Sequence, residues 1–154
     1  MPERQTLERA RRDAREGKAP STQAGEFVRE EIEHIREGKH GARSTKQAIA
    51  IGLSKARRAG VKLPAPKGGE ASLRTRKQAK RDVRNGSSAK PSAKRSRATL
   101  RALKKEGRSA ASHRALATQA KRAARKRSAT ARSEQAKRAA RTRRANRSSN
   151  GGSR

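Results

Sequence analysis

The chain has 154 residues, of which 44 are Lys or Arg and 13 are Asp or Glu, and its formal net charge is +31 at pH 7. Hydrophobic residues make up 29% and aromatic residues 1%, which excludes a large globular core, and the absence of cysteine excludes disulfides and thiolate metal sites. Because no apolar run approaches the roughly 18 residues of a membrane-spanning helix, we expect a cytoplasmic protein of the nucleoid with no membrane partner.

This composition predicts an all-α fold, in which a short helical hairpin forms a head and a largely disordered or marginally helical arm rich in Lys, Arg and Ala follows it. The expected divisions are a short charged helix and turn at 1–21, a helical hairpin at 22–63, a Pro/Gly linker at 64–72 and a basic low-complexity arm at 73–154. Residues 1–63 carry 15 basic and 9 acidic side chains, whereas the rest of the chain carries 29 and 4.

The first expected helix covers residues 3–16 and stops at Gly17. A second is expected at 22–37, where Val28, Ile32 and Ile35 follow helical spacing with Phe27 beside them, and Phe27 is expected to be a core residue. The acidic side chains of this helix are expected on its outer surface: Glu26, Glu30, Glu31, Glu33 and Glu37.

A third helix is expected at 45–59, because Ser44 and Gln47 have the spacing of a capping box. Its apolar stripe should consist of Ile49, Leu53 and Ala56, with Ile49 in the core. This stripe is expected to pack on the helix at 22–37 across a loop of about seven residues.

The linker is indicated by Pro64 and Pro66, which forbid a continuing helix. In the arm, helical stretches are expected at 71–84, 93–106 and 110–145, with breaks at 85–92 and over the final seven residues. The phrase QAKRAAR occurs twice in the arm, which indicates duplication of a basic helical segment.

The sequence shows no evident catalytic or metal-binding site. The three histidines, His34, His40 and His113, have no second His, Cys or carboxylate at a recognisable metal-ligand spacing, and His34 with Glu30 is expected to be an ordinary surface pair. No nucleophile with an ordered base can be identified either. We therefore expect a protein that is not an enzyme and has no metal or cofactor.

Nucleic acid is the expected partner, since few other cellular molecules match this charge density. Single-stranded binders stack bases on aromatic rings, and Phe27 is the only aromatic residue, so duplex DNA is favoured and RNA stays open. The expected contacts are Lys55, Arg57, Arg58, Arg76, Lys77, Lys80, Arg81, Lys121, Arg122, Arg125, Lys126, Arg127, Lys137, Arg138, Arg141, Arg143 and Arg144.

Histone-like, largely sequence-independent DNA binding is therefore the leading interpretation. Alternatives are an RNA- or ribosome-associated basic protein, and a protein-interaction module with a polyanion-binding tail. Like charges four residues apart, such as Lys121 with Arg125 and Lys137 with Arg141, disfavour the free helix, so the arm should gain helix when phosphates neutralise it.

One segment resembles a known family. The residues that carry the resemblance are Glu37, Gly38, Lys39, Ser44, Lys46, Gln47, Ala48, Ile49, Ala50, Ile51, Leu53, Ser54, Ala56 and Arg57. Over residues 25–64 the chain is similar to a small bacterial family of short basic proteins of unknown function, and departs from it at Thr45, Gly52 and Lys55. The resemblance implies a helical head and no particular reaction, and the arm resembles the tails of linker-histone-like bacterial proteins in composition only.

Overall fold

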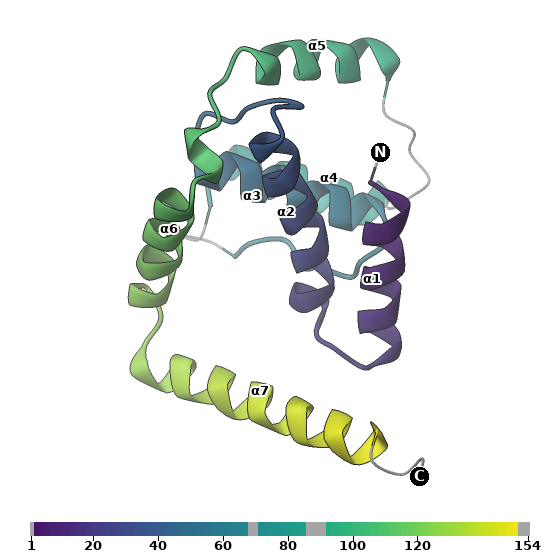
Figure 1. Ribbon diagram of the computed structural model, residues 1–154, viewed down its shortest axis with the longest axis vertical. Coiled ribbons are helices and arrows are strands. Elements are labelled where there is room, and N and C mark those ends of the chain that lie inside the picture. The colour runs from purple at the N-terminus through teal and green to yellow at the C-terminus, as the bar shows by residue number, and fades with distance from the viewer. Residues whose placement is uncertain (1, 68–70, 86–91, 151–154) are drawn as a thin grey trace.

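The computed structural model describes residues 2–67, 71–85 and 92–150, and these residues form helices and connections without a strand (Figure 1). The elements are α1 (Arg4–Arg15), α2 (Pro20–Arg36), α3 (Thr45–Arg58), α4 (Leu73–Asn85), α5 (Ala93–Lys104), a 3-10 turn η1 (Ser109–Ala111), α6 (His113–Arg125) and α7 (Ala129–Asn150). The all-α prediction is confirmed for this part of the chain. Parts of the expected linker, the expected break and the C-terminal tail (68–70, 86–91 and 151–154) lie outside the described residues.

Glycines end the first two helices at the repeated sequence REGK. Gly17 and Gly38 have φ of 68° and 78°, a left-handed conformation that suits glycine. In both turns the following lysine amide closes the helix end: Lys18 N–H donates to Asp13 O at 2.9 Å, and Lys39 N–H donates to His34 O at 3.0 Å. The repeat is therefore a helix-ending signal.

Helices α1, α2 and α3 form the head, with α2 packed between the other two (Figure 1). Phe27 is 1% exposed and lies in an apolar cluster with Ala10, Ala24 and Ala56, so its assignment to the core is confirmed. Ser44 caps α3 as predicted, because its hydroxyl accepts from the amide of Gln47 at 3.2 Å.

The buried stripe of α3 includes Ala56, as predicted, but otherwise differs from the predicted one. It consists of small residues, including Ala48, Gly52 and Ala56, while Ile49 is only half-buried. A Cβ at Gly52 would lie 2.6 Å from Val28 Cα, so the two backbones meet at this glycine. Small side chains allow this close approach, and the larger Ile49 is displaced to the flank of the contact.

The prediction of an acidic outer surface at residues 22–37 is wrong for two of the five glutamates that it named. Glu30 is 2% exposed and Glu31 is 0% exposed. The N-terminal end of α1 covers Glu30, whose carboxylate accepts from Glu3 N–H at 3.0 Å, and Lys55 on α3 reaches both carboxylates. Burial is tolerated here because cations and donors accompany the charges.

Residues 103–111, which we call the docking segment, return to the head. Gly41 N–H donates to Leu103 O at 2.9 Å, and Ala42 N–H donates to Gly107 O at 3.1 Å. Ala110 and Ala111 complete a second apolar cluster that includes Ile32, Ile35 and Ala48. The sequence places this segment in the basic arm and gives no sign of its packing.

The helix predicted over 110–145 is not continuous. The 3-10 turn η1 precedes α6, and α6 ends at Arg125 before α7 begins at Ala129. Ser112 accepts from Ala115 N–H at 3.2 Å and Ser128 from Ala131 N–H at 3.1 Å, so each serine starts a new helix. Helix α7 lies apart from the head in Figure 1 and extends beyond the predicted end at residue 145.

Candidate nucleic-acid interface

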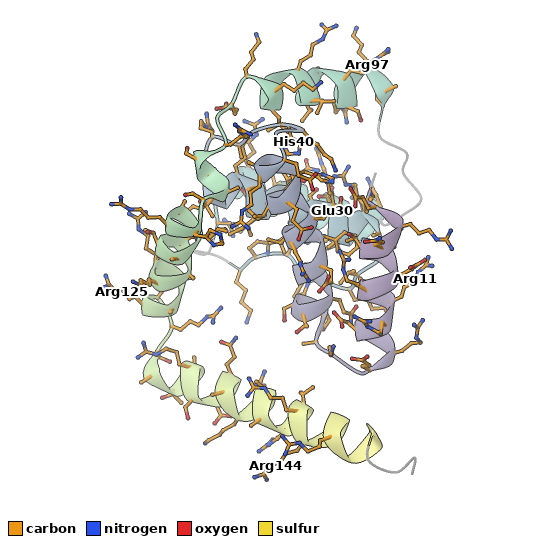
Figure 2. All side chains as sticks on the ribbon, in the orientation of Figure 1. Arg11, Glu30, His40, Arg97, Arg125 and Arg144 are labelled. Atoms are coloured by element: carbon orange, nitrogen blue, oxygen red, sulfur yellow. The ribbon has the colours of Figure 1, made fainter. Side chains whose placement is uncertain are left out.

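Helices α6 and α7 form a long, strongly positive stretch of the described chain. Residues 113–147 contain thirteen Lys or Arg and one acidic residue, Glu134. Their cationic side chains are exposed, and Figure 2 shows Arg125 and Arg144 extending from the ribbon of these helices. A surface of this kind attracts phosphate groups without requiring a particular base sequence.

Ion pairs between described residues are concentrated elsewhere. They join side chains between Glu3 and Lys55, apart from one pair in α7 between Lys137 and Glu134 at 3.3 Å. The acidic residues of the head therefore neutralise cations of the head, and the positive charge of α6 and α7 is left mostly for an external partner.

Most of the predicted contact residues are on the surface. The exposed ones are Lys77, Lys80, Arg81, Lys121, Arg122, Arg125, Lys126, Arg127, Lys137, Arg138, Arg141, Arg143 and Arg144. Arg58 and Arg76 are half-buried. These contact residues are spread over α3, α4, α6, α7 and the connection between α6 and α7, so the fold does not gather them on one element.

Lys55 has an internal role. Its ammonium lies 3.2 Å from Glu30 Oε1 and 2.8 Å from Glu31 Oε2, and its side chain is 17% exposed. Burial tends to raise the pKa of Glu30, but hydrogen bonds from the Glu3 amide and the Thr6 hydroxyl, together with the Lys55 charge, leave that pKa below its usual value. Lys55 is therefore the counter-ion of two buried carboxylates, and we leave it out of the interface.

Arg57 is also internal, with 7% of its surface exposed. Its guanidinium donates to Leu63 O at 3.3 Å and to Pro64 O at 3.0 Å. Burial lowers the pKa of Arg57, and the nearby charge of Asp82 opposes that change. Arg57 thus holds the chain that leaves α3, and it too is left out of the interface.

A groove of about 620 Å³ lies where the N-termini of α3 and α6 meet. Four cations line it: Arg43, Lys46, Arg114 and Arg122. Helix N-termini carry partial positive charge and exposed amide groups, so both helices add to the positive potential of this groove. The charge of this groove favours an anionic partner.

Only Arg122 of these four cations is among the predicted contacts. The cap positions Ser44 and Ser112 are recognisable as helix starts in the sequence. The docking segment brings these two helix starts side by side. For example, the Thr45 hydroxyl donates to the carbonyl oxygen of Ala110 at 2.7 Å. No local pattern predicts such a contact across 65 residues.

Comparison with protein-family models finds a match in the N-terminal part of the chain. Residues 4–67 match the model of a family described as a family of unknown function, DUF6496. No curated protein matches the chain, and no solved structure does. Among the described helices, none combines the length and the apolar composition needed to cross a bilayer. From α1 to the chain that follows α3, the protein is therefore similar to an uncharacterised family, over a range that includes residues 25–64.

Proposed function

We propose that this protein binds duplex nucleic acid, and duplex DNA in particular, as a non-enzymatic, largely sequence-independent protein of the nucleoid. The observation that carries the proposal is the excess of exposed cations on α6 and α7, where thirteen Lys or Arg accompany a single acidic residue. Phosphates bound there would release condensed counterions, and this release favours binding whatever the base sequence.

Duplex is favoured over single strands because of what α6 and α7 lack. Neither helix contains a Phe, Tyr or Trp, and the one aromatic residue of the chain, Phe27, is buried in the head. Stacking of unpaired bases normally needs such side chains. Backbone phosphates are therefore the expected contact.

The groove between α3 and α6 offers one localised phosphate-binding position, whereas the other cations of α6 and α7 are spread along the helices. Arg43, Lys46 and Arg114 are added there to the predicted contacts, close to two helix starts. A phosphate in the groove would be held between the head and α6, and α7 would then follow the backbone of the duplex.

Two variants with equal charge change test the proposal. In Arg122→Gln/Arg125→Gln, two exposed cations of α6 are lost, and in the control Arg11→Gln/Arg15→Gln, two exposed cations of α1 are lost. Binding of a labelled 30-base-pair duplex is measured by fluorescence anisotropy at several salt concentrations. If both arginines contact phosphates, the slope of log affinity against log salt falls by about 2 for the α6 variant. The control leaves the slope nearly unchanged.

The same assay, with competitors of equal length, separates the alternatives. Tighter binding to double-stranded RNA than to DNA would favour the RNA-associated alternative. An absence of binding to DNA and to folded RNA at low salt would contradict both, and would leave the protein-interaction alternative. Equal loss in the α6 and α1 variants would show that only net charge matters, and would remove α6 as the interface.

A further inference from the structure

A compact group of potential metal ligands lies at the C-terminal end of α2. Glu31, His34 and His40 each offer one ligand atom, and these atoms lie within 4.8 Å of one another. Glu31 and His34 are three residues apart on one face of α2. His40 joins them because the left-handed turn at Gly38 reverses the chain, and Figure 2 labels His40 at this end of the helix.

Glu31 is the least satisfied group of the described residues. It is 0% exposed, and neither of its carboxylate oxygens has a hydrogen-bond partner. Its neighbours are Lys55 Nζ, 2.8 Å from Oε2, and His40 Nε2, 3.4 Å from Oε1. Lys55 is shared with Glu30 and lies beside Oε2, whereas Glu31 Oε1 faces the imidazole of His40. A buried carboxylate oxygen in that position normally needs a donor or a cation.

The tautomer of His40 determines whether its ring can donate a hydrogen bond to Glu31. Nδ1 lies 3.1 Å from the carbonyl oxygen of Gly41, which can only accept, so Nδ1 carries the proton. In the neutral ring, Nε2 then has a lone pair, and this lone pair faces Glu31 Oε1 at 3.4 Å. Two ligands at about 2.0 to 2.1 Å from a tetrahedral zinc ion are about 3.3 Å apart, so a zinc ion fits between these atoms.

The surroundings support the site in two ways. Nδ1–H of His40 bonded to a backbone carbonyl is the arrangement that usually fixes the ring of a metal-bound histidine. His34 is held by a carboxylate, since Glu3 Oε1 lies 2.8 Å from its Nε2. The two rings are edge to face with centroids 6.2 Å apart.

Local charge also favours a cation, although the protein as a whole is strongly positive. Three carboxylates, those of Glu3, Glu30 and Glu31, gather here with two ammonium groups, those of Lys39 and Lys55. With neutral imidazoles, the group is therefore negative. We propose that Glu31, His34 and His40 form a binding site for a divalent transition-metal ion, with Zn²⁺ as the preferred ion.

The first test uses the full-length protein, freed of nucleic acid and treated with chelator. Zn²⁺ is titrated while the imidazole resonances are followed by NMR; the chain has only three histidines, and His113 on α6 is the internal control. We expect Zn²⁺ to shift the signals of His34 and His40 at one ion per chain and to leave His113 unchanged. Equal shifts of all three rings, or none, would overturn the proposal.

The second test uses variants. His40→Ala and Glu31→Gln are expected to weaken Zn²⁺ binding, measured by calorimetry, by about tenfold or more, whereas His113→Ala is expected to leave it unchanged. Far-UV circular dichroism checks that each variant is folded. Co²⁺ in place of Zn²⁺ should give visible ligand-field absorption in the wild type that His40→Ala abolishes. Unchanged Zn²⁺ affinity in folded His40→Ala would overturn the proposal. The contact between Glu31 and His40 would then be an ordinary hydrogen bond.

Discussion

Gly52 decides how closely α2 and α3 approach each other. A methyl group at this position would meet the Val28 backbone at 2.6 Å, a distance that only a shift of one helix can relieve. Ala48 and Ala56, which are also buried on α3, are small as well, so the two helices approach closely and the head is stabilised with few large apolar side chains.

Replacement of Gly52 by Ala is therefore expected to destabilise the head by about 1 to 3 kcal/mol through overpacking, despite the better helix propensity of Ala. Gly25→Ala is the matched control: Gly25 is exposed on α2, and a methyl group there meets nothing within 4 Å. The control should be neutral or more stable by about 0.4 to 1 kcal/mol. Urea unfolding followed by far-UV circular dichroism suits a chain without Trp or Tyr. Equal stability of both variants would contradict the close packing.

Residues whose surroundings are local were predictable, and residues whose surroundings come from distant segments were not. Phe27 is an aromatic residue on an apolar stripe, so its burial follows from helical spacing. Glu31 is charged and was expected at the surface. Its burial depends on Lys55 from α3, and the same contact removes Lys55 from the proposed phosphate-binding surface.

The docking segment is the element on which the second apolar cluster depends. Gly41 lies directly against it, and a Cβ at Gly41 would be 2.0 Å from Glu106 O. We expect Gly41→Ala to loosen the segment and to speed hydrogen exchange of the Ala42 amide, which donates to Gly107 O, by about tenfold or more. Gly107→Ala, where a methyl group has free space, is the control. Slow exchange at Ala42 in both variants would contradict the docking.

Helix α7 is the element least supported by packing. It lies apart from the head, and Lys137 and Arg141 place like charges one turn apart. We expect ¹³Cα chemical shifts of residues 129–147 to show partial helix in low salt and to move toward full helix when duplex DNA is added. Full helicity without DNA would contradict coupled folding.

Start and stop signals explain why the helices were largely predictable. Gly17, Gly38 and Ser44 act within one turn of the chain, so the residues that define these ends are neighbours in sequence. Ser128 gives the same local signal, which the long basic pattern at 110–145 concealed. The docking segment could not be predicted, because alanine is equally suited to an exposed basic helix and to a buried contact.

In the complete chain, we expect thermal stability to depend on the head with its docking segment, and DNA affinity to depend in part on α7. A chain that ends at Ser128 keeps the docking segment and loses α7. We expect its thermal midpoint to match that of the full chain, while the salt dependence of DNA affinity falls in proportion to the phosphate contacts removed. A chain that ends at Ala102 lacks the docking segment and is expected to unfold at lower temperature. Equal midpoints of the two shortened chains would contradict this division.

The contact between the docking segment and α2 joins residues far apart in the chain, since Arg36 donates to the carbonyl oxygen of Ala111 across 75 positions. At about 5 to 20 residues per second, a ribosome needs about 4 to 15 s to add that stretch. During this interval α2 has emerged while the surface that will cover Ile35 has not been translated. The nascent protein therefore completes its second apolar cluster only after α4 and α5 have been made.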